Sequence, residues 1–286
     1  MTDRSGDAGG PMARRLSPFR RSAAFAAADR LHAGQWTKLG PSLLAWPVPL
    51  LLGVLWWYGC RHGWISAQVL PPPSQVGQVL VDDWSSGELQ RNLTISLLRV
   101  AGGASLGVFV GLLLGVSMAL SETVKDYLYP TFRVVAYIPL LGWLPLLVLF
   151  VGIGETLKIL LIAKAAFVPV TLNTYRGIRD VPGHYLELGR VYRFSAWQSL
   201  WRIVVPAAFP QIWAGVRYAL TQSWLLLVVV EFLASSEGLG YMMISGQQLF
   251  QLDQVAAAIG VVGVIGLLLD RALRAVETVM SKHRKR

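Results

Sequence analysis

The apolar residues of this chain gather in six long runs separated by shorter polar segments. A bilayer core about 30 Å thick is crossed by a helix of roughly 20 mainly apolar residues. Because lipid offers no water to the peptide groups, such runs must be helical. We therefore predict an all-α membrane protein with about six transmembrane helices. The runs lie at about 42–60, 97–120, 128–151, 156–174, 207–234 and 254–272.

Composition agrees with a membrane protein. Hydrophobic residues make up 54% of the 286 residues and charged residues only 15%, against roughly 25% charged in typical soluble domains. The single cysteine, Cys60, excludes an intramolecular disulfide, and the four histidines have no metal-ligand spacing. The net charge of +10 does not indicate nucleic acid, since no soluble domain with interleaved basic and aromatic residues is present.

The placement of Lys and Arg predicts the orientation of the spans, because positive charge is retained on the cytoplasmic side. With the N-terminus inside, 20 of the 26 Lys and Arg residues fall in cytoplasmic segments, and only Arg61, Arg91 and Lys158 fall on the other side. We therefore expect both termini to be cytoplasmic. A basic N-terminal tail would cover 1–41 and a basic C-terminal tail 276–286.

Segment 61–96 is then expected in the periplasm, between the first span and a core of five spans over 97–275. Ser74 follows three prolines and is placed to cap a helix. Val76, Leu80 and Trp84 then recur at helical spacing. This pattern predicts a short amphipathic helix on the outer surface of the membrane.

The polar segment 180–206, between the fourth and fifth runs, predicts two short cytoplasmic helices. Asp180 can cap the first, and Pro182 suits its first turn. Ser195 and Gln198 have the spacing of a capping box that starts the second. We expect the second helix to end before Pro206.

An apolar stripe runs along the second helix, at Trp197, Leu200, Trp201 and Val204. The stripe suits a helix that rests on the membrane interface, and it suits equally well a helix that docks on another protein. Spacing alone does not separate these two interpretations.

The same segment resembles the EAA loop of binding-protein-dependent ABC transporter permeases. Glu187 stands at the glutamate of that pattern, and Leu188 and Gly189 replace its two alanines. Ile203 and Pro206 keep their spacing, while Val205 replaces a leucine. Arg193 occupies the position of the pattern's glycine. The arginine makes a tight turn there less easy to form.

Further matches to this family extend over roughly residues 45–280 and are similar to its sulfonate, taurine and nitrate branch. They include Leu70-Pro71-Pro72-Pro73-Ser74, Ser86-Gly87-Glu88-Leu89, Ser96-Leu97-Leu98-Arg99-Val100, Gly152-Ile153-Gly154-Glu155, Leu172-Asn173-Thr174-Tyr175-Arg176-Gly177-Ile178 and Ser235-Ser236-Glu237-Gly238-Leu239-Gly240-Tyr241. The resemblance implies the type I, MetI-like permease fold. It also implies an inner-membrane subunit that moves a small anion, such as an aliphatic sulfonate, taurine or nitrate, from periplasm to cytoplasm.

The resemblance further implies several partners. These are a dimer of ATP-binding subunits, a periplasmic substrate-binding protein and a second copy of the permease. The chain itself has no Gly-x-x-x-x-Gly-Lys-[Ser/Thr] phosphate loop. ATP and magnesium are therefore expected on the partner ATPase, and this chain is expected to bind no cofactor and to perform no covalent chemistry. The expected ATPase-coupling residues are Glu187, Leu188, Gly189, Arg193, Trp197, Trp201 and Pro206.

Charges inside spans are costly and need a reason. Lys164 lies well inside the fourth run and suits an anionic solute, so we consider it a candidate for the translocation pathway. A structural ion pair with Glu231, near the outer end of the fifth run, is the equally weighted alternative. Arg99 and Arg217 lie near span ends, where snorkelling to lipid headgroups is the simpler explanation.

Two prolines interrupt the third run. Pro139 and Pro145, with Trp143 between them, break its hydrogen-bond ladder and could shape a gate. A plain structural kink is the simpler interpretation. These three residues complete the set of candidate pathway residues.

Two other classes of protein also have several spans. An ion-coupled secondary transporter would normally show inverted repeats, which are not evident here, and would not need the cytoplasmic helix pair. A membrane-embedded enzyme would need a histidine cluster, an activated nucleophile or paired carboxylates, which are not evident either. Within the ABC class, an uncharged heterocycle remains an alternative solute.

Overall fold

The structure is a computed structural model that describes residues 47–66 and 68–283. The predicted basic tail over 1–41, the start of the first predicted span and residues 284–286 lie outside the described residues. The described chain falls into two compact units that divide after Tyr58. The first described helix, α3 (Pro47–Arg61), carries the apolar residues of the first predicted span.

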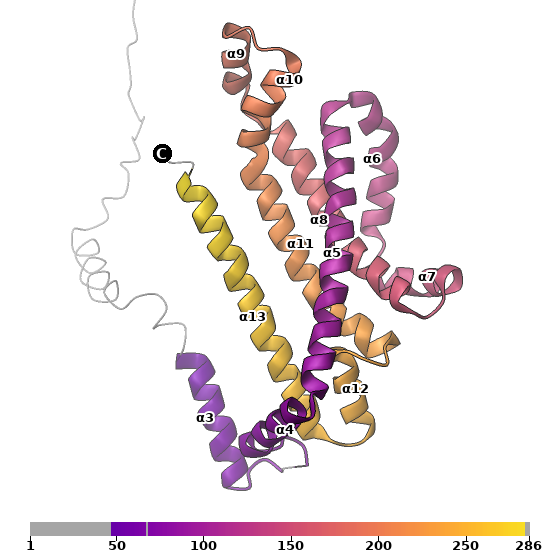
Figure 1. Cartoon of the computed structure of the whole chain (residues 1–286), viewed down its shortest axis with the longest axis vertical. Helices are drawn as coiled ribbons and strands as arrows, with labels where there is room; N and C mark the ends of the chain where they lie inside the picture. Colours follow the sequence, from indigo (N-terminus) through magenta and orange to yellow (C-terminus); the bar gives the residue numbers. More distant parts are fainter. Residues whose placement is uncertain (1–46, 67, 284–286) are drawn as a thin grey trace, which may run out of the picture. The chain divides into compact units, whose positions relative to one another are not determined.

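All regular elements of the described residues are helices, as predicted. Three long helices form the centre of the second unit: α5 (Glu88–Leu120), α8 (Glu155–Arg179) and α11 (Val205–Ala234). They lie side by side, with α8 in contact with both others (Figure 1). α5 begins at Glu88, well before the expected start of the second span at 97.

Glycine allows α5 and α8 to approach closely. The α5 glycines 103, 107, 111 and 115 recur at every fourth position, and all are buried against α8. A Cβ added at Gly103 would lie 2.7 Å from Ile162 Cβ, and one added at Gly115 would lie 2.7 Å from Thr174 Cβ. Small residues are a common means of packing helices in membranes.

The third predicted span is broken in the middle. α6 (Glu122–Tyr137) is followed by a 3-10 turn, η1 (Leu140–Trp143), and by α7 (Leu144–Val151). The two halves are bent by 100°. The expectation of one helix over 128–151 was therefore wrong, and the predicted break at the prolines is confirmed. Pro139 precedes η1 and Pro145 lies in the first turn of α7, where a missing N–H costs nothing.

Shorter helices lie beside the far ends of the long ones. α4 (Pro73–Ser86) contacts α5 and α13 (Leu252–His283), and α12 (Leu239–Gln248) contacts α11 and α13. The predicted cap at Ser74 is wrong, because the N-cap residue of α4 is Pro72 and no side chain caps the helix. The expected C-terminal tail is helical as far as His283.

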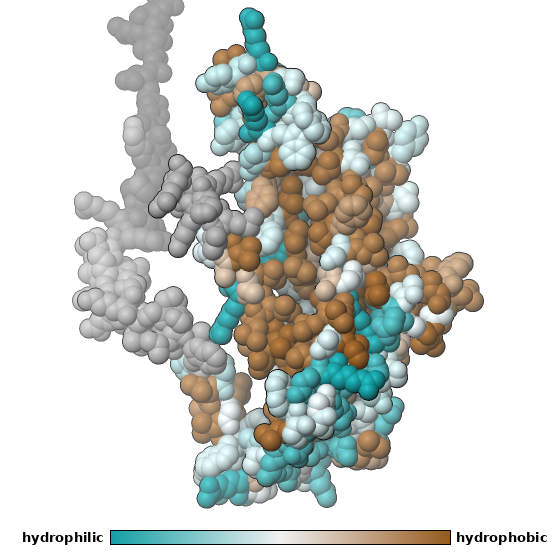
Figure 2. Space-filling model, in the orientation of Figure 1, coloured by the Kyte–Doolittle hydropathy of each residue, from teal (hydrophilic) through white to brown (hydrophobic). Residues whose placement is uncertain are grey.

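Three helices of the described residues are long and apolar enough to cross a membrane, and the bent pair makes a fourth if it counts as one span. The long helix α8 is not among them, and Lys158, Lys164 and Asn173 are part of its sequence. The count of six spans therefore stays a prediction. Figure 2 shows hydrophobic side chains over the middle of the second unit and hydrophilic ones toward its ends.

Candidate coupling segment and translocation cavity

The segment after α8 forms a helical hairpin at one end of the second unit (Figure 1). It consists of α9 (Gly183–Val191), α10 (Ala196–Ser199) and a π-helical turn, η2 (Leu200–Val204). The predicted capping box is confirmed: Gln198 N donates to Ser195 Oγ at 3.2 Å, and Ser195 N donates to Gln198 Oε1 at 3.0 Å. The sequence therefore starts the second helix where expected.

Two details of this segment differ from the prediction. Asp180 is the C-cap residue of α8, and Pro182 is the N-cap residue of α9. The second helix does not end before Pro206 but continues through η2 into α11. Proline has no N–H to complete the α-helical ladder, and the widened π turn before it carries the chain past this gap. The hairpin is thus continuous with a long helix of the core.

Arg193 forms the tight turn between the two short helices. Its φ is +52°, in the left-handed region. Arg193 N donates to Arg190 O at 3.0 Å and Phe194 N donates to Gly189 O at 2.9 Å, which are the two bonds of a Schellman motif. Glycine adopts this conformation without a Cβ penalty. The arginine thus preserves the turn of the family pattern and carries strain.

Gly189 allows the two arms of the hairpin to touch. It is buried, and a Cβ added to it would lie 2.9 Å from Ile203 Cδ1 and 3.2 Å from Ser199 Oγ. The family pattern has a small alanine at this position. The requirement for a small residue therefore has a steric cause.

The outer surface of the hairpin is rich in exposed aromatic and charged groups. The edge of Trp201 meets Trp197, with 5.5 Å between the ring centroids. Glu187 is exposed on α9. A groove of about 330 Å³ lies between the arms. It is lined by Tyr185, Leu188, Tyr192, Phe194, Arg202, Ile203, Pro206 and Ala207. All the predicted coupling residues except the buried Gly189 are thus exposed.

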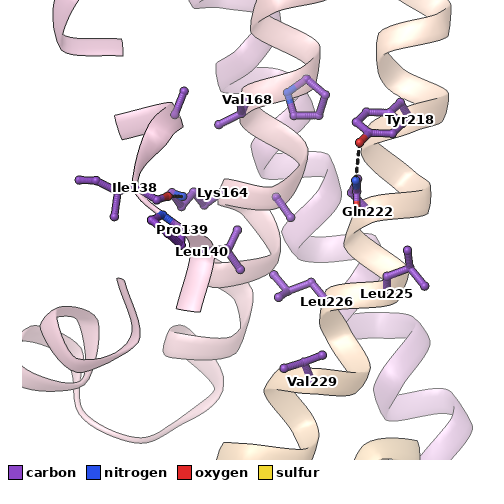
Figure 3. Close-up of a pocket in the computed structure, with 13 residues that line it drawn as sticks. Ile138, Pro139, Leu140, Lys164, Val168, Tyr218, Gln222, Leu225, Leu226 and Val229 are labelled. Carbon is purple, nitrogen blue, oxygen red and sulfur yellow. Dashed lines mark hydrogen bonds between the residues drawn. The ribbon is translucent and has the colours of Figure 1, made fainter. Parts of the chain in front are cut away.

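A second hollow, of about 460 Å³, lies between α6, α8 and α11. Lys164 lies on one side of it and Tyr218 and Gln222 on the other (Figure 3). The remaining lining residues are apolar and come from the α6–η1 break, α8 and α11. They are Ala136, Ile138, Pro139, Leu140, Ala165, Val168, Pro169, Leu225, Leu226 and Val229.

The ammonium of Lys164 is held by the break in the third span. Lys164 Nζ donates to Ile138 O at 3.0 Å and lies 5.5 Å from the centroid of the Trp143 ring. Ile138 is the C-cap residue of α6, and its carbonyl belongs to the negative end of that helix. No carboxylate of the described residues pairs with Lys164. The alternative of a structural pair with Glu231 is therefore wrong.

Glu231 is fully buried and pairs instead with Arg99. Arg99 Nη1 donates to Glu231 Oε1 at 2.7 Å, and the other nitrogens of Arg99 donate to Glu155 at 2.6 and 2.7 Å. Arg99 is only 4% exposed. The expectation that it snorkels to lipid headgroups was therefore wrong. Arg217 also has a partner, Glu277, at 2.5 Å.

The loop between α11 and α12 closes around this ion pair. Ser96 Oγ donates to both oxygens of Glu231 at 2.8 Å, and Gly240 N donates to Glu231 Oε2 at 3.0 Å. Gly238 N donates to Asn92 Oδ1 at 2.7 Å. These bonds satisfy the buried carboxylate, as burial of a charge requires. We call Arg99, Glu155, Glu231 and the residues bonded to them the Arg99 ion network.

The Arg99 ion network brings together three of the sequence motifs described above: Ser96 to Val100, Gly152 to Glu155 and Ser235 to Tyr241. The sequence alone does not indicate that these motifs form one site. Glu231 and Pro145 do not line the cavity, whereas Pro139 does. Trp143 contacts the cavity only through Lys164. Tyr218 and Gln222 were missed, since polar residues at that spacing in a long helix give no particular signal.

Comparison with known proteins then identifies the class. The family model described as binding-protein-dependent transport system inner membrane component matches residues 107–282. The chain belongs to this family. The permease is 38% identical over 237 residues to a Bacillus subtilis protein named for aliphatic sulfonates transport, SsuC, covering 83% of this chain and 86% of that protein.

Other relatives of the permease agree. It is 35% identical to the taurine transport system permease protein TauC of Escherichia coli, covering 87% of this chain and 94% of that protein. It is 33% identical to the nitrate import permease protein NrtB of Synechocystis, covering 74% of this chain and 80% of that protein. The permease is thus a multi-pass inner-membrane component of an ABC importer, as the family resemblance implied.

The fold of the permease also has a solved counterpart. One chain of the inward-facing MetNI methionine ABC transporter aligns with a TM-score of 0.56 at 18% identity, over 67% of this chain and 97% of that one. The MetI-like fold expected from the sequence is therefore confirmed.

Proposed function

We propose that this permease moves a small oxyanion, such as an aliphatic sulfonate, taurine or nitrate, from the periplasm to the cytoplasm. A periplasmic binding protein delivers the solute, a separate ATPase dimer drives the cycle, and a second copy completes the pathway. The relatives named above are named for such solutes. Both termini of the permease lie in the cytoplasm.

The observation that carries this proposal is the state of Lys164. A cation inside a membrane is usually paired with an opposite charge or with backbone carbonyls. Among the described residues Lys164 bonds only to the carbonyl of Ile138, which offers a dipole but no negative charge. Its ammonium has three N–H donors and lies on a cavity whose other walls are mainly apolar. An anion in this cavity would supply the missing negative charge.

A hydroxyl on the opposite wall also supports an oxyanion in the cavity. Gln222 Nε2 donates to Tyr218 Oη at 2.5 Å, which leaves the hydroxyl proton of Tyr218 free to donate across the cavity. Ammonium and hydroxyl groups both donate, as recognition of sulfonate or nitrate oxygens requires.

The α9–α10 hairpin transmits the work of the ATPase. Its exposed aromatic and acidic surface is suited to a groove of the ATP-binding subunit, where Glu187 meets a donor and Trp197 and Trp201 anchor the second arm. The hairpin continues through η2 into α11, which carries Tyr218 and Gln222 at the cavity. A rigid-body movement of the hairpin would therefore reach the solute directly.

The test is uptake of ethanesulfonate, taurine and nitrate into proteoliposomes that contain the permease with its ATPase and binding protein. Lys164→Met removes the charge and keeps a side chain of similar length, and it is expected to abolish uptake. Lys164→Arg should retain part of it, and Lys125→Gln, at the exposed cytoplasmic end of α6, should transport normally. Wild-type rates in Lys164→Met, or transport only of an uncharged heterocycle, would disprove the anion pathway.

A further inference from the structure

A second cation of the cavity region, Arg133, has no carboxylate partner among the described residues. Its guanidinium lies 5.5 Å from the ring centroid of Tyr137 and 5.9 Å from that of Tyr129, and it donates to the hydroxyl of Tyr137 at 3.3 Å. Arg133 is exposed on α6. It is thus held by two aromatic side chains while its charge stays uncompensated.

The carboxylates nearest in sequence, Asp126 and Glu122, lie beside other cations. Asp126 Oδ1 is 3.6 Å from Lys125 Nζ. Glu122, at the start of α6, is bonded to both Lys125 and Arg179. The hydrogen bonds from Lys125 and then from Arg179 lower the pKa of Glu122 below its usual value, so this carboxylate stays ionised. At 11 residues and ~1.5 Å per residue, Glu122 is about 16 Å from Arg133 along the helix axis.

Arg133 lies about one helical turn from the cavity, toward the proposed cytoplasmic end of α6. Ala136, which lines the cavity, follows it by three residues, close to one turn of the helix. Ile138, whose carbonyl holds Lys164, follows it by five residues, or ~7.5 Å of helix rise. Arg133 and Lys164 therefore flank the end of α6, and both lie beside aromatic rings without an acidic partner.

We propose that Arg133 is a second anion-binding residue of the pathway, to which the solute passes from Lys164 before its release to the cytoplasm. This inference rests on the anion transport proposed above. A single cationic site would hold an anion too firmly, whereas passage requires several sites from which the ion can leave. The position of Arg133, between the cavity and the cytoplasmic end of α6, suits the second of two such sites.

The rival role of Arg133 is an anchor to anionic lipid headgroups. It lies only five residues beyond the predicted start of the third span at 128, and a long side chain can reach outward over that distance. An anchor would act through the lipid rather than through the solute. The experiment therefore varies both.

The experiment measures uptake of ethanesulfonate and nitrate in proteoliposomes that contain the complete transporter. Arg133→Gln should lower the maximal rate about 10-fold while the half-saturating concentration stays within about 2-fold, because release is impaired and entry is not. Arg133→Lys keeps the charge and should retain much of the rate. Arg271→Gln, which removes an exposed arginine from α13, is the matched control and should behave as wild type.

Each outcome has a separate meaning. If Arg133→Gln transports normally while Lys164→Met does not, the role of Arg133 is disproved and the proposed function stands. If neither variant differs from wild type, the proposed function itself fails. If the defect of Arg133→Gln disappears in vesicles of pure phosphatidylcholine, Arg133 is a lipid anchor and the inference is overturned. The inference is supported if Arg133→Gln loses uptake and Arg133→Lys retains it, both in vesicles that contain anionic lipid and in vesicles of pure phosphatidylcholine.

Discussion

Arg99 and Glu231 form an ion pair of 2.7 Å that is almost entirely closed to solvent, with side-chain exposures of 4% and 0%. The pair joins α5 to α11, and Glu155, at the start of α8, joins it from a third helix. Three helices that are distant in sequence are thereby tied at one end. A buried pair is stable only when its remaining polar atoms are satisfied, which explains the surrounding bonds from Ser96 and Gly240.

Removing the cation of this pair should destabilise the permease strongly. Arg99→Met would leave Glu231 as a buried carboxylate with no cation, which typically costs about 3–5 kcal/mol. The measurement is thermal unfolding of the purified protein in detergent. Arg91→Gln, which breaks the exposed pair with Glu237, is the control and should cost about 0–1 kcal/mol. Equal effects of the two substitutions would show that burial of the Arg99 pair is unimportant.

The loop around Glu231 depends on a glycine for two reasons. Gly238 has a φ of +112°, and a Cβ added there would collide with the carboxylate of Glu231. We expect Gly238→Ala to cost at least about 2 kcal/mol, through backbone strain and overpacking. Gly87→Ala is the matched control, because Gly87 has a φ of +82° with open space around it.

Both alanine variants strain the backbone, but only Gly238→Ala collides with Glu231. The difference between their free energies of unfolding therefore measures the cost of the collision. Gly87→Ala should cost only about 1–2 kcal/mol. If both variants unfold at the same temperature, the loop adjusts freely, and the close packing around the carboxylate contributes little to stability.

The strain at Arg193 leads to a prediction of the opposite sign. Arg193→Gly should stabilise the permease by up to about 1 kcal/mol, because glycine adopts the left-handed turn without a penalty. Its added freedom in the unfolded chain offsets part of that gain. Thermal unfolding measures the effect. Binding to the ATPase should persist, since both bonds of the turn are made by the backbone. A clear loss of stability would mean that the arginine side chain itself stabilises the permease.

Much of the fold follows from local patterns in the sequence. The capping box at Ser195 and the break at Pro139 each depend on residues close together in the chain, and both are found. Errors occurred where a distant contact decides the outcome. Arg99 looks like an arginine near a span end, and only the folded chain brings Glu231 and Glu155 to it.

The cavity shows the same limit. The sequence indicates Lys164 because a charge inside an apolar run is unusual, but the contact of Lys164 with Ile138 depends on the 100° bend between α6 and α7. The sequence predicts that bend at Pro139 but gives no angle for it. Tyr218 and Gln222 reach the cavity only because α11 packs against α8 near Lys164. Residue types thus suggested the chemistry, and helix packing decided which residues share it.

The exposed tryptophans of the α9–α10 hairpin lead to a prediction that separates docking from folding. Trp197 is 67% exposed, and its ring makes a T-shaped contact with that of Trp201. Trp197→Ala should therefore change the free energy of unfolding by less than about 0.5 kcal/mol, yet it should abolish co-purification with the ATPase and solute-stimulated ATP hydrolysis. Trp84→Ala, an equally exposed tryptophan on α4 at 60%, is the control and should leave both unchanged. If Trp197→Ala retained the ATPase and its solute-stimulated hydrolysis, this tryptophan would not be a docking residue, and the work of ATP hydrolysis would have to enter the permease elsewhere.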